Sequence, residues 1–364
     1  MRRRLFVLLL GCAMGVVARP ASAQSSLSAT CDSPEVQAGD ATGKCLVAAQ
    51  ALVSAQPSVG ILVAGGNPTV GTSGSAGFRL GVLPRLSAGI RLNVVPMRLP
   101  DIIGDHQTGE GETGGGRYEA SLAALSADAS FALTRGFTMS PGMGGIGALS
   151  LLGSFTYVPV SLFDAEGFER SSNQAFGVGA RLHLLDESFV APGVSVSVMR
   201  RTLDEVRLGD ICDGNMTDLQ GGGDGSSGLT TGACASGGDP GEIAFDLTDW
   251  STRLVASKHL LGIGVSGGIG YDRYASEGSF GFRDDPIPGT DVAATAFRVA
   301  DREFSSSRWS VFGDLSYTLL VGTIGAEGGW QQGGSAISGF GGLDSDFDPG
   351  AGTWFGSIGA RLAL

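Results

Sequence analysis

The feature that most constrains this chain is a set of segments in which apolar and polar residues alternate. From Leu86 to Val94, every second residue is apolar and the residues between are small or polar. Such a period of two places one kind of side chain on each face of a β-strand, whereas a helix would mix them. The same alternation recurs at residues 176–184, 261–272 and 308–319. The chain is therefore predicted to be mostly β.

Composition narrows the class further. The 61 glycines among 364 residues follow no strict G-X-Y period and accompany only 14 prolines, which excludes collagen. Glycine at this density also excludes a long coiled coil. The formal charge of −12 argues against a nucleic-acid partner, because phosphate binding needs a basic surface.

The amino terminus has the three parts of a secretory signal peptide. MRRR is followed by the apolar run LFVLLLGCAMGVVA and by small residues that end at Ala23. Residues 1–23 are therefore predicted to be removed on export. An alternative takes residues 9–12 as a lipobox with Cys12 lipidated. Cleavage after Ala23 removes four arginines and no acidic residue, which changes the formal charge from −12 to −16.

The exported chain keeps four cysteines, Cys31, Cys45, Cys212 and Cys234. An even number suits an oxidising compartment, and the short separations favour the pairs Cys31–Cys45 and Cys212–Cys234 among the three possible pairings. No C-x-x-C spacing is present, so neither a metal site nor a cofactor is predicted.

No apolar run after residue 23 is long enough for a membrane-spanning helix, which needs ~20 residues. A membrane-spanning β-strand needs only about 9 to 11 alternating residues. Short connections are predicted near residues 84–85, 134–138, 186–189, 258–260 and 319–321, and long ones near 67–74, 100–116, 161–173, 204–241, 276–305 and 333–350. This alternation predicts twelve strands with both termini on the short-turn side, and short periplasmic turns with longer outer loops are typical of outer-membrane barrels.

The chain from about Ser58 to Leu364 resembles a bacterial outer-membrane β-barrel protein. Its last segment, TWFGSIGARLAL, is similar to the C-terminal strand signal that this family presents to its barrel-assembly machinery. The final Leu364 departs from the Phe or Trp most often found there. The resemblance implies an all-β, antiparallel, up-and-down transmembrane barrel of about 12 strands at residues 58–364, surrounded by outer-membrane lipid.

Residues 24–57 are predicted to form a periplasmic extension with one short helix at residues 44–55, bounded by Gly43 and Pro57. Apolar residues of this helix would cover the periplasmic mouth as a plug. Two alternatives are that they pack on the barrel rim or belong to a loosely held tail.

The apolar positions change parity between Leu122 and Leu125, and again between Leu247 and Trp250. A β-bulge would produce each change, because one extra residue reverses every later side chain. Misplaced strand limits would explain the changes equally well.

Charged residues share the side that the alternation assigns to the lumen. A transverse field from such residues would select solutes, as rings of charge do in pores. Alternatively, internal ion pairs would fill a small barrel and hold it rigid. The residues predicted to face the lumen are Arg79, Arg91, Asp128, Arg181, Arg253, Asp272, Arg308, Asp314, Glu327 and Arg361.

The longest loop, residues 204–241, is polar and would fold inward to constrict a pore or outward to meet a partner. Its DGNMTD stretch lacks the closing Glu of a calcium loop. Asp344, Asp346 and Asp348 would bind divalent cations weakly, although a solvated loop is the better interpretation.

Enzymatic activity is not predicted. His106 follows Asp105 in an expected outer loop, His183 faces the expected lumen, and His259 lies at an expected turn. No G-x-S-x-G elbow, Walker A motif or dinucleotide fingerprint is present.

The first functional hypothesis is a porin-like channel for passive passage of small hydrophilic solutes. The second is a closed structural or adhesive barrel whose outer loops bind a partner. A third, a soluble Gly-rich β protein of the periplasm, would leave the terminal strand pattern unexplained.

Overall fold

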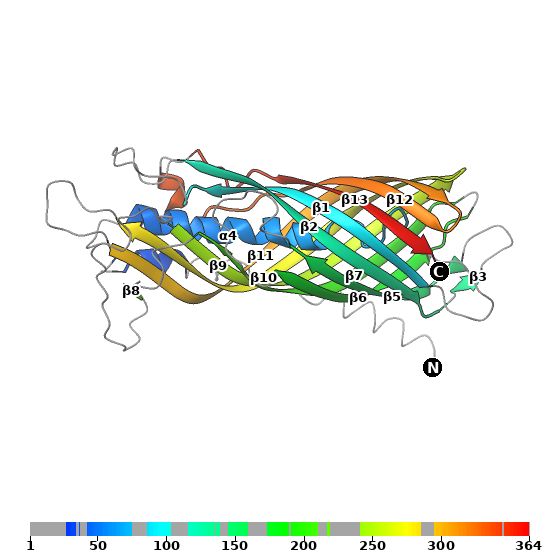
Figure 1. Ribbon diagram of the computed structural model, residues 1–364, viewed down its shortest axis with the longest axis horizontal. Helices are drawn as coiled ribbons and strands as arrows, with labels where there is room; N and C mark the ends of the chain where they lie inside the picture. The colour runs from blue at the N-terminus through cyan, green and yellow to red at the C-terminus, as the bar shows by residue number, and fades with distance from the viewer. Residues whose placement is uncertain are drawn as a thin grey trace.

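The computed structural model shows a closed antiparallel β-barrel that surrounds a helix (Figure 1). The structure describes residues 27–33, 36, 42–74, 86–102, 116–134, 136–138, 145–158, 173–188, 191–209, 217–218, 241–284, 295–343 and 346–363. Ten strands form the wall in the order β10-β9-β7-β6-β5-β2-β1-β13-β12-β11, and β10 pairs with β11 to close it. The strands are β1 (Leu86–Pro100), β2 (Arg117–Ala132), β5 (Ala148–Tyr157), β6 (Gln174–Leu185), β7 (Gly193–Leu208), β9 (Gly241–Leu260), β10 (Ile263–Asp284), β11 (Thr295–Leu319), β12 (Gly322–Gln331) and β13 (Thr353–Ala363).

Three short strands lie outside this wall. β3 (Phe137–Thr138) and β4 (Gly145–Ile146) form a small hairpin in the connection between β2 and β5. β8 (Thr217–Asp218) belongs to the loop between β7 and β9 and pairs in parallel with β11. A single turn of 3₁₀-helix, η5 (Phe340–Gly342), lies between β12 and β13.

The expected count of about twelve strands is wrong, because the wall has ten. Helix α4 (Thr42–Ala64) continues through Pro57 and includes residues 58–64, which were expected to begin the barrel. The first wall strand of the described chain is β1, at Leu86. A proline inside a helix normally ends it, but here the barrel surrounds the helix and tertiary packing overrides the local preference.

The short connections lie at one end of the barrel and the long ones at the other, as the alternation predicted, except that residues 67–74 were expected to be a long outer connection and instead lie in the lumen. At the short-turn end, Leu261 and Gly262 join β9 to β10, and both have positive φ, as a two-residue hairpin requires. β1 begins at this end and β13 finishes there, because Ser87 lies opposite Ala363. Figure 1 shows the C-terminus at this end and β8 at the other.

All four tryptophans mark one level of the wall. Trp309 lies opposite Tyr271 in the ladder, with ring centroids 4.8 Å apart, and Trp330 lies opposite Trp354. Trp250 lies opposite Arg273, two residues from Tyr271. Tryptophan and tyrosine gather where a membrane meets water, so this level is the long-loop boundary of the bilayer.

The tryptophan level divides the barrel into two parts. The short-turn half contains residues 86–94 of β1, 250–260 of β9 and 309–319 of β11, with the matching parts of the other strands. Its outer face is apolar and exposed, as at Ile90, Val265 and Leu315. The long-loop half contains residues 95–100 of β1, 241–249 of β9 and 295–308 of β11. Its inner face is apolar and buried, as at Leu99 and Phe245.

The two expected parity changes have this division as their cause. β1 and β2 keep one continuous register from Leu86–Phe131 to Pro100–Arg117, so no bulge lies between Leu122 and Leu125. Leu122 is apolar and points inward in the long-loop half, whereas Leu125 is apolar and points outward in the short-turn half. The same reversal explains Leu247 and Trp250.

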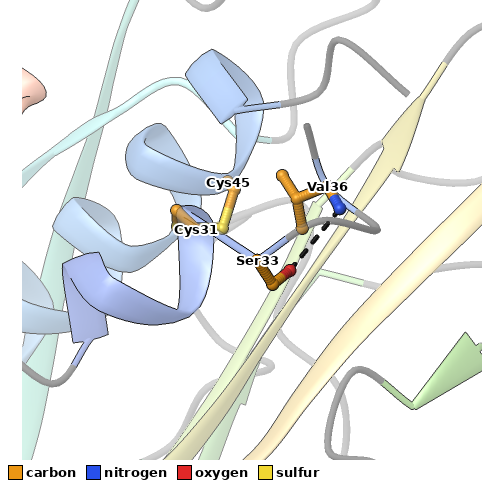
Figure 2. Close-up of a disulfide and its surroundings, with 4 residues drawn as sticks. All are labelled: Cys31, Ser33, Val36 and Cys45. Carbon is orange, nitrogen blue, oxygen red and sulfur yellow. Dashed lines mark hydrogen bonds between the residues drawn. A yellow bond between two sulfur atoms is a disulfide. The ribbon is translucent and has the colours of Figure 1, made fainter. Parts of the chain in front are cut away.

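The disulfide predicted between Cys31 and Cys45 is present and joins helical residues 27–31 to the first turns of α4 (Figure 2). Ser33 Oγ accepts a hydrogen bond from the Val36 backbone N–H. Leu27, Cys31 and Val36 are fully buried in the apolar core of the long-loop half. The described residues of the segment 24–57 therefore lie in the core of the long-loop half, at the opposite end from the mouth that they were expected to cover.

Candidate functional site in the barrel lumen

Residues 42–74, named here the internal segment, run through the lumen from the long-loop half to the short-turn end. Helix α4 forms its first part and packs mainly against β1, β10 and β9. The helix is apolar on all sides, and of the helices in the described chain it alone has the length and hydropathy to cross a membrane, yet it is buried inside the barrel. Gly60 allows the helix to approach the Tyr274 ring of the wall closely, because a Cβ at residue 60 would lie 2.3 Å from that ring. The long-loop half is thus filled by apolar packing.

Four hydrogen bonds fix the height of α4 in the barrel. Gln50 Oε1 accepts from the Ile337 backbone N–H at 2.8 Å. Gln56 donates to Ser276 at 2.8 Å and accepts from Ser306 at 2.7 Å. Near the end of the helix, Asn93 Nδ2 donates to the Leu62 carbonyl at 2.9 Å. These contacts join the helix to four separate parts of the wall and loops.

Two arginines of the wall bind the carbonyls that follow the helix. Gly65 has a φ of +62° and ends α4, with its N–H bonded to the Ile61 carbonyl. Arg253 donates to the carbonyls of Gly65 and Gly66 at 2.9 and 3.0 Å. Arg91 donates to the Asn67 carbonyl at 2.8 Å. Cations at the C-terminus of a helix oppose the negative end of its dipole, so these arginines stabilise this turn.

Asn67 is the centre of the polar network below the helix. Its side-chain oxygen accepts from Arg181 at 2.9 Å, and its Nδ2 donates to Asp314 at 3.3 Å. The backbone N–H groups of Gly66 and Asn67 donate to the two Glu327 carboxylate oxygens at 2.9 and 2.6 Å. Together with Arg91, charged groups from four wall strands therefore hold one residue of the internal segment.

The last part of the internal segment reaches the short-turn end. Ser73 donates from its backbone to Ser257 Oγ at 2.9 Å, and the two hydroxyls lie 2.7 Å apart. The His183 ring lies between the Ser73 carbonyl, 3.0 Å from Nδ1, and Ser150 Oγ, 3.1 Å from Nε2. Polar contacts thus continue to the last described residues before β1.

The charged residues predicted for the lumen lie on the inner side of the wall wherever the structure describes them. Arg253 pairs with Asp272 and Arg91 with Asp128, each at 2.7 Å. Arg361 donates to Thr323 at 3.2 Å. Arg308 lies higher, beside a cavity in the long-loop half. Arg79 lies outside the described residues.

Sequence reasoning missed one buried ion pair. Arg201 donates to Asp249 at 3.2 Å and to Ser251 at 2.6 Å, and both charged side chains are buried. Asp249 follows directly after apolar Leu247 on the inner face, so it lies where the pattern changed parity. The alternation of Arg253, Ser251 and Asp249 on one face was the signal that would have found it.

Other predicted sites have different outcomes. The pair Cys212–Cys234, His106 and Asp344 lie outside the described residues. His259 Nδ1 lies 2.8 Å from Glu187 in the turn after β6. Asp346 and Asp348 are exposed. Among the described residues, no group of three or more His, Cys, Asp or Glu side chains is arranged to hold a metal ion.

No protein-family model matches this chain, and no curated protein matches it. Among solved structures, the translocator domain of the autotransporter NalP from Neisseria meningitidis is similar with 10% identity over 78% of this chain and 89% of that chain, at a TM-score of 0.37. The TodX monoaromatic hydrocarbon channel is similar with 11% identity over 83% and 98%, at 0.29. The copper transporter OprC is similar with 13% identity over 70% and 38%, at 0.28.

These likenesses concern barrel architecture alone. The polarity of the wall identifies the same architecture without them. An apolar outer face below a tryptophan level, a polar inner face and a closed sheet without edges are the properties of a transmembrane barrel. The chain therefore folds as a transmembrane β-barrel with residues 42–74 inside it.

Proposed function

We propose that this outer-membrane β-barrel is closed by its internal segment and acts through its long-loop end at the cell surface. One observation carries the proposal: residues 42–74 occupy the lumen along its length and bind the wall at every level. This is the second of the two functions expected from the sequence, a closed barrel whose outer loops bind a partner. Export by a signal peptide cleaved after Ala23 and insertion by the barrel-assembly machinery belong to the same proposal.

The direction of the internal segment supports a role at the surface. α4 begins at the long-loop end, where η5 lies against it, and the chain then runs toward the short-turn end. Because outer-membrane barrels place long loops outside the cell, the disulfide between Cys31 and Cys45 lies on the outer side. The N-terminal segment and the long loops together then form the surface that meets a partner.

Single-channel recording in a planar bilayer tests the closed lumen. The refolded mature protein, residues 24–364, should produce no stable conductance steps. A variant that lacks residues 24–74 should produce steps, because the polar inner face of the short-turn half would then line a water path. The matched control, Cys31→Ser with Cys45→Ser, keeps the internal segment in place and should stay silent.

Folding of each variant is checked first by heat-modifiable gel mobility. Stable steps from the full mature protein would contradict a closed barrel. Silence from a deletion variant shown to be folded would also contradict it, because another element would then have to close the lumen.

A second candidate is passage of small hydrophilic solutes after a shift of the internal segment. The observation that favours it is that residues 65–74 form no helix or strand and are held by polar contacts rather than by apolar packing. A disulfide between Ser73→Cys and Ser257→Cys would hold this part in place. A gated channel predicts three results. The wild type conducts, the double variant conducts only after reduction, and Ser257→Cys alone behaves as the wild type.

We propose no enzymatic role. The described histidines His183 and His259 contact the internal segment and a turn, respectively, and this arrangement supports a structural use for both.

A further inference from the structure

A cavity of about 90 Å³ lies in the long-loop half, between α4 and the wall. Pro57 and Ser58 of α4 form one side, and Arg308 of β11, Gln331 at the end of β12 and Thr353 at the start of β13 form the other. The connection between β12 and β13 covers it. A single water needs about 10–15 Å³ by the same kind of measure, so this space holds several waters or one small polar molecule.

Arg308 lies in the wall of this cavity and is 92% buried, with 8% of its surface exposed. Its Nη1 donates to the Ser307 carbonyl at 2.9 Å, and this is its one hydrogen bond within the described residues. The carboxylate opposite it in the ladder, Asp272, is already bound by Arg253 at 2.7 Å. The guanidinium also lies against the backbone of Gly334, where a Cβ would be 2.4 Å from Nη2. Arg308 is therefore a buried cation that has no acidic partner in the part of the chain that the structure describes.

A buried charge without a partner is costly, because burial removes it from water. The buried arginines Arg91, Arg201 and Arg253 each have a carboxylate at 2.7–3.2 Å. The buried Arg181 and Arg361 instead donate to uncharged groups of Asn67 and Thr323. Arg308 differs because its remaining N–H groups border a cavity rather than a side chain. A guanidinium presents paired N–H donors that match the two oxygens of a carboxylate or a phosphate. The group that would compensate Arg308 is therefore an oxyanion in the cavity.

The cavity rim carries charges of both signs at the outer side. Arg98 and Arg117 line it, and both donate to the same oxygen of Glu119, at 3.2 and 2.8 Å. Asp346 and Asp348 also line the rim but are exposed, and Asp348 accepts from the Gly350 N–H. The buried end of the cavity is thus cationic, and the carboxylates are at the solvated end.

We propose that this cavity is a binding site for a small soluble oxyanion, with a carboxylate or phosphate group bound by Arg308. The ligand enters from the long-loop end and lies above the polar network around Asn67. The site does not depend on whether the lumen below is closed, so its test is separate from the conductance experiment.

The test is isothermal titration of the refolded mature protein in detergent with inorganic phosphate and, separately, with acetate. At least one of the two anions should bind saturably at one site per chain. Arg308→Gln removes the charge and the paired donors and should weaken this binding about tenfold or more. Arg308→Lys keeps the charge without the paired donors and should weaken it less.

The matched control is Arg200→Gln, which removes an equal charge from an exposed arginine that lies over the Trp250 ring, away from the cavity. It should bind the anion as the wild type does. If Arg308→Gln fails the heat-modifiability test for folding, Arg308→Lys alone decides. Absence of saturable binding of both anions, or equal binding by the wild type and the folded Arg308 variants, would overturn the proposal.

A lipid headgroup carries the same chemistry as free phosphate. The titration is therefore repeated with protein in vesicles of phosphatidylcholine and in vesicles that also contain phosphatidylglycerol. Phosphate binding should persist in both. Its loss only in the phosphatidylglycerol vesicles would assign Arg308 to a headgroup and overturn the assignment to a soluble ligand.

Discussion

The two halves of the barrel wall have opposite polarity although the same strands form them. In the short-turn half, β1 places Ile90 outward and Arg91 inward, and in the long-loop half it places Arg98 outward and Leu99 inward. The short-turn half faces lipid and encloses a hydrogen-bonded network. The long-loop half faces water and encloses an apolar helix, as a soluble protein encloses its core.

This difference shows that the polarity of a strand face is set by what that face meets, not by the strand. The backbone keeps its register through the change, since β1 and β2 pair without a shift from one end to the other. The polarity pattern of one half does not hold in the other. Variants that are expected to have different effects in the two halves therefore test this division directly.

The largest effect is expected from an unpaired charge in the short-turn half. Arg253→Met should lower the free energy of unfolding by roughly 3–5 kcal/mol, because Asp272 would remain buried without its cation. Urea unfolding in lipid vesicles, followed by tryptophan fluorescence, measures it. The double variant with Asp272→Leu should recover part of the loss. An unchanged midpoint in the single variant would show that water reaches this pair.

The next effect comes from charge on the lipid-facing surface. Ile90→Arg should cost about 2–4 kcal/mol if residue 90 lies near the bilayer midplane. Ser121→Arg, at an exposed outward position of the long-loop half, should stay within about 0.5 kcal/mol. The same unfolding assay measures both variants. Equal costs at the two positions would remove the distinction between a lipid-facing half and a water-facing half.

A smaller effect separates protein core from lipid as surroundings for one methyl group. Ile243→Val lies in the apolar core of the long-loop half and should cost about 0.5–1.5 kcal/mol. Ile263→Val removes the same group from the lipid-facing surface, where acyl chains refill the space, and should change stability by less than about 0.5 kcal/mol. The difference between the two unfolding midpoints tests whether protein core and lipid surround the methyl group differently.

The tryptophan level at the boundary between the halves predicts how strongly tryptophan fluorescence is quenched at each membrane depth, without loss of stability. A variant that keeps Trp309 and carries Phe at Trp250, Trp330 and Trp354 should be quenched more by lipids brominated near the headgroup than by lipids brominated near the terminal methyl. The opposite order would move the tryptophan level, and the bilayer boundary with it, into the hydrocarbon.

Several features of the molecule could be predicted from sequence because they depend on local alternation. The outward row from Leu86 to Val94 needed only a period of two. The short hairpin between β9 and β10 was expected at residues 258–260, three residues before its place at Leu261 and Gly262, because alternation does not fix where a strand ends. The disulfide between Cys31 and Cys45 depended on their short separation. One of the two additional strands expected before Leu86 is absent because residues 58–64 continue a helix, which the surrounding wall stabilises. The other was expected at residues 75–83, which lie outside the described residues.

The sequence by itself determined that the chain is a closed, antiparallel, membrane-type β-barrel whose wall begins and ends at the short-turn side, because alternation and loop length are local properties. Only the tertiary structure decided what fills the lumen. Residues 42–74 are held there by partners such as Arg253 and Glu327, which are distant in the chain. Contacts over such separations leave no periodic signal in either segment, and they exist only once the barrel has closed around the helix.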